Sequence, residues 1–204
     1  VDKWICIAPH IEKKLRTEAT YEPANKLKLI RPGISLDKWP LKTKQTDGYQ
    51  VGMVVGDIWD LKNPIAGMNI FAVLCKQFPK LPWKLRIRGQ YEAGNEYYPV
   101  MYKHFIESRG LQNRITIEGP VDNMNDFYEE IDLLLHTGLK EGFSYAVCEA
   151  MAKGIKPVIN KFYGSEDIWL EEYLFDTYDE AIGMLITRKE PEKYRKYIEE
   201  NYNM

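Results

Sequence analysis

Short apolar runs alternate along the chain with longer segments in which apolar and polar residues mix at helical spacing. Runs of this length are typical of buried strands, and the mixed segments are typical of amphipathic helices. Strands are predicted at 3–8, 27–30, 49–55, 83–88, 114–117, 133–135 and 157–159, and helices at 11–18, 63–78, 95–110, 125–131, 143–153, 177–186 and 191–200. This alternation predicts an α/β fold, a doubly wound parallel sheet with helices on both faces.

Residues that typically begin or end helices and strands predict several element boundaries. Asn63 followed by Pro64 is the pattern of a helix N-cap with proline at the first helical position. Gly56 is expected to close the strand that precedes it. The polar segment Leu41 to Gly48 predicts a linker.

Composition narrows the class of protein. The chain has 204 residues, 45% hydrophobic residues and a net charge of -2, which suits a domain with a core and argues against nucleic acid as partner. No apolar run approaches the about 20 residues of a transmembrane helix. Cys6, Cys75 and Cys148 are isolated and odd in number. They are interpreted as buried thiols of a reducing compartment, which predicts a cytoplasmic location.

One segment, 132–159, carries the most specific chemistry. It contains a predicted strand, a loop, a helix and a second strand, which together make a parallel crossover unit. Glu141 stands just before the helix, and Glu149 follows eight residues later within it. The placing of these two carboxylates at the mouth of a strand and on the next helix is the informative feature.

The N-terminus of this helix suits a phosphate, because its N–H groups are free and its dipole is positive. Gly142 has no Cβ, so an anion can approach the backbone. Neither carboxylate suits the anion, but both can accept hydrogen bonds from hydroxyl groups. Glu149 is expected about 10 Å along the helix, so one glutamate could hold a hexose and the other a ribose. The alternative is a structural helix with two exposed acids, because a chain with 30 acidic residues contains such pairs by chance.

The chain resembles the group 1 (family four) glycosyltransferases of the GT-B fold. The resemblance rests on Glu141 and Glu149 spaced as E-x7-E, on the turn Ala150 to Gly154 and on the strand Lys156 to Ile159. It implies a Rossmann-like C-terminal domain that binds a nucleotide-diphosphate sugar donor. It further implies retaining transfer to a carbohydrate or other acceptor, with no cofactor and no metal. No Asp-x-Asp pair or His/Cys cluster calls for a metal.

The same resemblance divides the chain into three parts. Residues 1–46 resemble the end of the N-terminal GT-B domain with the interdomain linker, 47–187 the nucleotide-sugar-binding domain, and 188–204 a C-terminal helix that packs toward the N-terminal domain. A missing N-terminal domain would hold the carbohydrate or lipid-linked acceptor. The isolated chain is therefore expected to bind nucleotide without transferring sugar, and the full-length protein to work in the cytoplasm, including at the inner face of the membrane.

Lys62 follows the strand at 49–55 and precedes a helix, where an ammonium could neutralise a diphosphate. Relatives carry an arginine and a lysine in this loop; Lys62 matches the lysine, and Asp57 stands in the place of the arginine. This departure puts full phosphate neutralisation in doubt.

The resemblance also assigns the rest of the donor site. Gly89 matches a glycine near the donor, and Val121 lies in the segment that contacts the nucleotide base. The amides of Gly142, Phe143 and Ser144 would stabilise the leaving diphosphate together with Lys62. Glu141 is the predicted catalytic residue, orienting the sugar, and Glu149 would hold the ribose. His136 ends a strand nearby and is interpreted as structural, outside the site.

Other functions stay open at this point. A non-catalytic nucleotide-sugar-binding relative is suggested by Asp57. Another GT-B enzyme, such as a sugar-nucleotide epimerase that needs no acceptor or a phosphorylase that needs pyridoxal phosphate, would share the fold. A dinucleotide-dependent oxidoreductase is disfavoured, because no G-x-G-x-x-G follows the first strands.

Overall fold

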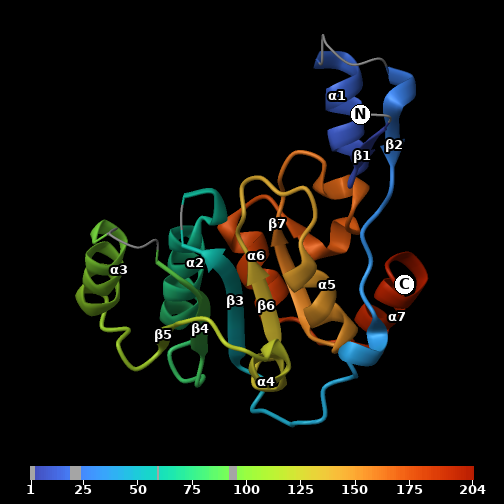
Figure 1. Cartoon of the computed structure of the whole chain (residues 1–204). Helices are drawn as coiled ribbons and strands as arrows, with labels where there is room; N and C mark the ends of the chain where they lie inside the picture. Colours follow the sequence, from blue (N-terminus) through green and yellow to red (C-terminus); the bar gives the residue numbers. More distant parts are fainter. Residues whose placement is uncertain (1–2, 19–23, 59, 92–95) are drawn as a thin grey trace.

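The computed structural model describes residues 3–18, 24–58, 60–91 and 96–204. Its body is a six-stranded parallel sheet in the order β5-β4-β3-β6-β7-β8, from which the pair β1–β2 projects together with α1 (Figure 1). The strands are β1 (Trp4–Cys6), β2 (Leu27–Leu29), β3 (Gln50–Asp57), β4 (Lys84–Gln90), β5 (Ile115–Glu118), β6 (Leu133–His136), β7 (Lys156–Asn160) and β8 (Leu174–Phe175). The helices are α1 (Pro9–Glu18), α2 (Pro64–Gln77), α3 (Tyr97–Ser108), α4 (Met124–Glu129), α5 (Tyr145–Ala152), α6 (Tyr178–Ile186) and α7 (Pro191–Asn201). The predicted doubly wound sheet is confirmed.

Two hydrophobic cores lie on opposite faces of the sheet. Successive side chains of a strand point to opposite faces, and β6 shows this directly. Leu133 and Leu135 belong to the core shared with α2, α3 and α6. Leu134 belongs to the core shared with α4, α5 and α7. All three leucines are at most 1% exposed, so β6 is buried on both sides, as its continuous apolar run predicts.

The strand β3 does not stop at Gly56 as predicted. Its pairing with β4 shifts between Val54 and Gly56, and the strand continues to Asp57. Gly56 has φ of 58°, a conformation that favours glycine. The glycine therefore marks a bulge inside the strand rather than its end.

The predicted start of α2 is confirmed, because Asn63 is its N-cap residue and Pro64 begins the helix. Asn63 differs from a typical N-cap, since it has φ of 46° and its side chain makes no capping hydrogen bond. The strand β8 was not predicted, because two residues are too few to show a period.

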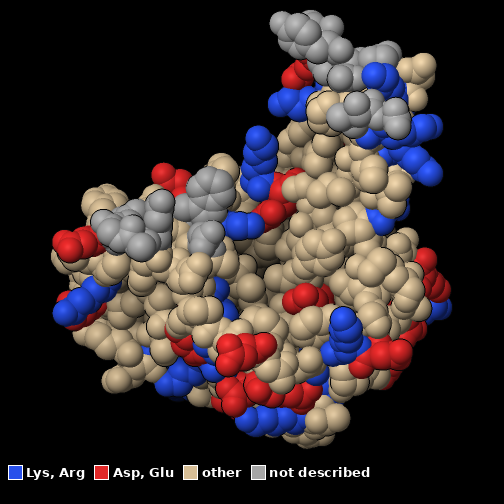
Figure 2. All heavy atoms as spheres, in the orientation of Figure 1, with Lys and Arg blue, Asp and Glu red and all other residues tan. Residues whose placement is uncertain are grey.

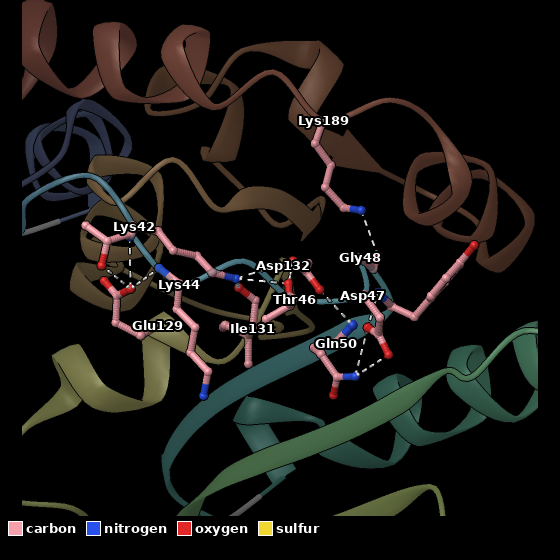
Figure 3. Close-up of polar contacts among 12 residues, drawn as sticks. Lys42, Lys44, Thr46, Asp47, Gly48, Gln50, Glu129, Ile131, Asp132 and Lys189 are labelled. Atoms are coloured by element: carbon pink, nitrogen blue, oxygen red, sulfur yellow. Dashed lines mark hydrogen bonds and ion pairs between the residues drawn. The ribbon is translucent and has the colours of Figure 1, made fainter.

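The polar linker is held firmly against the main body by hydrogen bonds (Figure 3). Lys42 Nζ donates to the carbonyl oxygen of Ile131 at 2.6 Å. The amides of Thr43 and Lys44 both donate to Glu129 Oε2 at 2.9 Å. The linker has no helix or strand of its own, and three of its amides donate instead to Glu129, at the end of α4, and to the carbonyl oxygen of Lys153.

Glu129 also pairs with Lys153, whose side chain is only 1% exposed, at 2.7 Å between Oε1 and Nζ. Partial burial acts to raise the pKa of Glu129, but hydrogen bonds from Lys153, Lys44 and Thr43 lower it to about 2. The stability that this carboxylate contributes is therefore present above its unfolded pKa, about 4.3. It is lost as the pH falls toward 2.

Replacing Glu129 with glutamine is expected to lower the free energy of unfolding by about 2–3 kcal/mol at pH 7, because a buried lysine loses its counter-charge. The difference in the free energy of unfolding between variant and wild type, measured by urea denaturation, should shrink as the pH falls from about 4.5 to 2. Glu107→Gln is the matched control, since Glu107 is 52% exposed and lies 4.0 Å from Lys103. Equal midpoints for both variants at pH 7 would contradict the assignment.

The C-terminal helix α7 packs against α5. The residues that follow it bond to the chain ahead of the linker: the Ile34 amide donates to the Tyr202 carbonyl at 2.8 Å, and the Met204 amide to the Ile34 carbonyl at 3.2 Å. Tyr194 and Tyr202 are nearly fully buried within these contacts. That 188–204 also packs toward a preceding domain stays a prediction, as do the predicted domain limits.

Candidate functional site

The strand order creates a crevice beyond the carboxyl ends of β3 and β6. After β3 the chain builds β4 and β5 on one side of it, then returns to place β6 on the other side. Loops that leave adjacent strands in opposite directions separate, and ligands of open α/β sheets bind in the gap between them. Lys62 lies in the loop that follows β3, and Glu141 in the loop that follows β6. The topology thus brings two predicted site residues to one point.

Lys62, Glu141 and His136 form a charged cluster in this crevice. Glu141 Oε1 lies 2.6 Å from Lys62 Nζ and 3.4 Å from His136 Nε2. The side chains are 11% exposed for Glu141, 30% for Lys62 and 6% for His136. Burial acts to raise the pKa of Glu141, but hydrogen bonds from His136 and Lys62 and the charge of Lys62 bring it below its ordinary value. Glu141 is therefore ionised at neutral pH.

Hydrogen bonds join the two loops that carry this cluster. The amide of Leu139 donates to the carbonyl oxygen of Leu61 at 2.9 Å. Thr137 Oγ1 lies 2.8 Å from the carbonyl oxygen of Asn63 and 3.1 Å from that of Lys62. Because the backbone of Lys62 is tied to the end of β6, the cluster is organised before any ligand binds.

Glu149 lies on α5 and accepts a hydrogen bond from the hydroxyl of Tyr128, at 2.9 Å from Oε2. Burial raises the pKa of Glu149, and the bond from Tyr128 offsets this only in part. Since α5 begins at Tyr145 rather than 143, Glu149 lies about 6 Å from the helix start, not the about 10 Å predicted. Tyr128 itself is completely buried.

The amides of Gly142, Phe143 and Ser144 precede α5 and donate no hydrogen bond to any other described residue. They are free to bind an anion, as a helix start requires. Gly142 also has a packing role, because a Cβ there would lie 2.9 Å from Ile7 Cδ1. The ring of Phe143 stacks on Trp169, with 6.0 Å between the ring centroids, which anchors the loop.

Gly89 and Val121 lie at the ends of the neighbouring strands. A Cβ on Gly89 would lie 2.7 Å from the carbonyl oxygen of Gly56 and 2.6 Å from Val55 Cγ2. Glycine is therefore required there by the close packing of β4 on β3, whether or not a donor approaches it. Val121 is 37% exposed in the loop after β5. The side chain of Asp57 lies outside the described residues, so the departure at the arginine position stays a sequence observation.

A cavity of about 760 Å³ opens beside Glu141, between α1 and the loop that follows β6. Its lining residues are His10, Ile11, Lys14, Leu15, Glu18, Leu139, Lys140, Glu141, Gly142 and Tyr163. Figure 2 shows the surface hollowed between the projecting N-terminal segment and the main body, with basic and acidic side chains at the edge of the hollow. His10 Nε2 lies 3.2 Å from the carbonyl oxygen of Glu141, which links α1 to the site.

Within the described part of the chain, no group of three His, Cys, Asp or Glu side chains could hold a metal ion. Among the same residues, no helix has the length and apolar character needed to cross a bilayer.

The sequence matches the family model of the glycosyl transferases group 1 over residues 37–204. The chain belongs to this family. Among curated proteins no match was found.

Solved structures agree with the family assignment. A Staphylococcus aureus TarM mutant, crystallised with fondaparinux, alpha-GlcNAc-glycerol and UDP, has a TM-score of 0.83 and 18% identity, covering 100% of this chain and 41% of TarM. Anabaena HepE in complex with UDP and glucose has a TM-score of 0.82 and 16% identity, covering 100% of this chain and 60% of HepE. The C-terminal domain of the Francisella tularensis group 1 protein LpcC has a TM-score of 0.72 and 17% identity, covering 84% of this chain and 100% of that domain. These similarities confirm the predicted Rossmann-like fold of a GT-B C-terminal domain.

His136, which the sequence predicts to be structural and outside the site, lies in contact with Glu141 in the structure. A single histidine at a strand end is more often structural than functional. The available signal was its place: it is the last residue of β6, at the carboxyl edge of the sheet and five residues before Glu141. Ligands of open α/β sheets bind at this edge, so a titratable side chain there is a candidate for contact with the ligand.

Proposed function

We propose that this chain is the donor-binding part of a glycosyltransferase and binds a nucleotide-diphosphate sugar at the crevice between β3 and β6. The observation that carries the proposal is the cluster of Lys62 and ionised Glu141 beside the unpartnered amides that precede α5. One ammonium and several amides suit a diphosphate, and carboxylates at its two sides suit hydroxyl groups. Family membership and the UDP complexes of TarM and HepE support the same choice of ligand.

In this proposal the catalysed step is departure of the nucleoside diphosphate from the anomeric carbon of the sugar. Negative charge then grows on the phosphate oxygens, where Lys62 and the amides of Gly142, Phe143 and Ser144 stabilise it. Glu141 accepts hydrogen bonds from the sugar and orients it, and Glu149 holds the ribose. Retention of configuration and independence of metal follow from the family resemblance.

The acceptor, a carbohydrate or a lipid-linked carbohydrate, is proposed to contact a preceding domain as well as this one. The chain spans 41% and 60% of the TarM and HepE chains, so it corresponds to part of such proteins. The isolated chain is therefore expected to bind donor without transferring sugar, because half of the cleft is absent.

Calorimetric titration of the isolated chain tests the proposal. The ligands are UDP, GDP, UDP-glucose, UDP-N-acetylglucosamine, UDP-galactose and GDP-mannose, each with and without EDTA. We expect micromolar to millimolar binding of one nucleotide series, unchanged by EDTA, and no release of nucleoside diphosphate when an acceptor mixture is added. Absence of binding throughout this panel would refute the proposed function.

A non-catalytic, nucleotide-sugar-binding relative is the second candidate, favoured by Asp57 at the arginine position. Restoring arginine there should strengthen binding of the diphosphate about tenfold if the position faces the phosphates. An unchanged dissociation constant would count against the assignment of this loop to the phosphates.

A further inference from the structure

We propose that His136 is a positioning residue for Glu141: it holds one carboxylate oxygen so that the other meets a hydroxyl of the donor sugar. This inference rests on the proposed function and adds a residue that neither the E-x7-E pattern nor the resemblance assigns. The geometry of the cluster carries it.

The two oxygens of Glu141 have different surroundings. Oε1 lies near both nitrogen atoms of the cluster, 2.6 Å from Lys62 Nζ and 3.4 Å from His136 Nε2. Oε2 accepts no hydrogen bond from any residue that the structure describes. An ionised carboxylate in a site only 11% exposed requires further donors. Oε2 is therefore the oxygen that is available to a sugar hydroxyl.

His136 is oriented for this contact. Its side chain is 6% exposed, and its ring lies 6.3 Å from that of Phe162, centroid to centroid. Nδ1 is buried without a partner among the described residues, so a proton there would be unsatisfied. The neutral tautomer that carries its proton on Nε2 fits this environment, and its N–H then lies on the nitrogen that is 3.4 Å from Glu141 Oε1.

Gly138 gives a second, independent observation. A Cβ at this position would lie 2.9 Å from His136 Cε1 and 3.1 Å from Glu141 Oε1. Gly138 has no positive φ that would demand glycine for the backbone. The absence of a side chain at 138 is what allows the imidazole and the carboxylate to approach each other.

The contact with His136 gains importance once a donor is bound. Lys62 is the candidate for the diphosphate, and a phosphate draws its ammonium away from Glu141. His136 is then the hydrogen-bonding residue that keeps Glu141 Oε1 in place. Because a neutral imidazole competes weakly for phosphate, it can stay on the carboxylate while Lys62 serves the diphosphate.

The test compares two ligands that differ only by the sugar. For the nucleotide selected by the panel above, the ratio of the dissociation constants of the nucleoside diphosphate and its sugar measures the sugar contribution. His136→Leu should reduce this ratio about tenfold, the effect of a hydrogen bond to a charged group. The affinity for the nucleoside diphosphate itself should change less than about twofold. His136→Gln, which keeps a donor near the position of Nε2, should retain most of the ratio.

Gly138→Ala extends the test without removing a functional group. It should reduce the ratio as His136→Leu does, whereas Gly183→Ala, where a Cβ meets nothing within 4 Å, should not. Thermal unfolding of each variant identifies any loss of fold.

The outcomes separate the two proposals. If the wild-type chain binds the nucleoside diphosphate and its sugar, the proposed function stands. The inference is then overturned by an unchanged ratio in His136→Leu, by an equal loss for both ligands, or by a wild-type ratio of one. If the wild-type chain binds no member of the panel, both proposals fail together.

Discussion

Replacing Lys62 with methionine is expected to weaken binding of the nucleoside diphosphate by about 30- to 150-fold, the effect of one charge-assisted contact of about 2–3 kcal/mol. The loss should be the same for the nucleoside diphosphate and for its sugar, because Lys62 faces the phosphates. Calorimetry at low ionic strength measures both constants. Salt should weaken the wild type more than the variant, since a charge–charge attraction is screened.

The same substitution should alter the pH dependence of stability. Hydrogen bonds from His136 and Lys62 hold the pKa of Glu141 below its ordinary value despite burial. A carboxyl with a lowered pKa contributes stability above its unfolded pKa and loses that contribution as the pH falls through its folded pKa. Without Lys62 this contribution should shrink, so the variant should be less stable than wild type at pH 7 and approach it at low pH.

Lys196→Met is the matched control, because the side chain of Lys196 is 71% exposed on α7 and pairs only loosely with Glu200, at 3.7 Å. It should leave both the affinity and the pH dependence unchanged. If Lys62→Met and Lys196→Met bind the diphosphate equally well, Lys62 does not contact the phosphates.

Replacing Glu149 with glutamine is expected to change stability and binding in opposite directions. Burial raises the pKa of Glu149, with partial relief from Tyr128. A carboxyl with a raised folded pKa is costly to ionise, so its effect on stability becomes unfavourable as the pH rises from the unfolded pKa through the folded pKa. At pH 7 the neutral glutamine should therefore raise the unfolding temperature.

Binding should fall in the same variant. An ionised carboxylate makes stronger hydrogen bonds with ribose hydroxyls than an amide does, so the affinity for the nucleoside diphosphate should drop about tenfold. Differential scanning calorimetry and titration of one preparation give both values. Tyr128→Phe tests whether the carboxylate itself is the cause, because it removes the hydrogen bond to Glu149 Oε2 but leaves the carboxylate in place. A glutamine variant that is less stable, or that binds as wild type does, would contradict this account.

A substitution that stabilises the protein at a proposed binding residue is informative about function. Proteins keep a buried ionised group that costs stability where a ligand requires it. The contrast with Glu129 is direct: there the carboxylate has a lowered pKa and is bound by Thr43 and Lys44 of the linker and by Lys153 at the end of α5, and its loss should cost stability. Both residues are partly buried acids, and only their partners separate a structural role from a proposed ligand contact.

Much of the fold could be predicted from local pattern. The leucines at 133–135 form a continuous apolar run, and such a run is buried on both faces of a parallel sheet wherever it lies in the chain. Pro64 begins α2 as predicted, because proline lacks the amide that a helix start leaves unpaired anyway. The positions of Lys62 and Glu141 at strand ends followed from the same pattern.

Other features had no local signal. Asn63 is the N-cap of α2, yet its backbone is left-handed, its side chain makes no capping hydrogen bond, and its carbonyl oxygen accepts a hydrogen bond from Thr137. The linker has a polar composition typical of a loose connection, yet Glu129, 86 residues away from Thr43, binds its backbone. Such contacts join residues that are remote in sequence, so propensity and periodicity carry no record of them.

By itself the sequence determined the α/β alternation, the two-sided burial of β6 and the E-x7-E spacing, because each depends on residues within one or two turns or strands. Only the tertiary structure decided that Glu141 Oε1 is shared by Lys62 and His136, that Glu149 is bound by Tyr128, and that Gly138 must lack a side chain. The contact of Tyr128 with Glu149 joins α4 to α5, and the other two features depend on which loops meet where the strand order reverses between β3 and β6. That meeting is set by the packing of the whole sheet, and no short segment of the chain contains it.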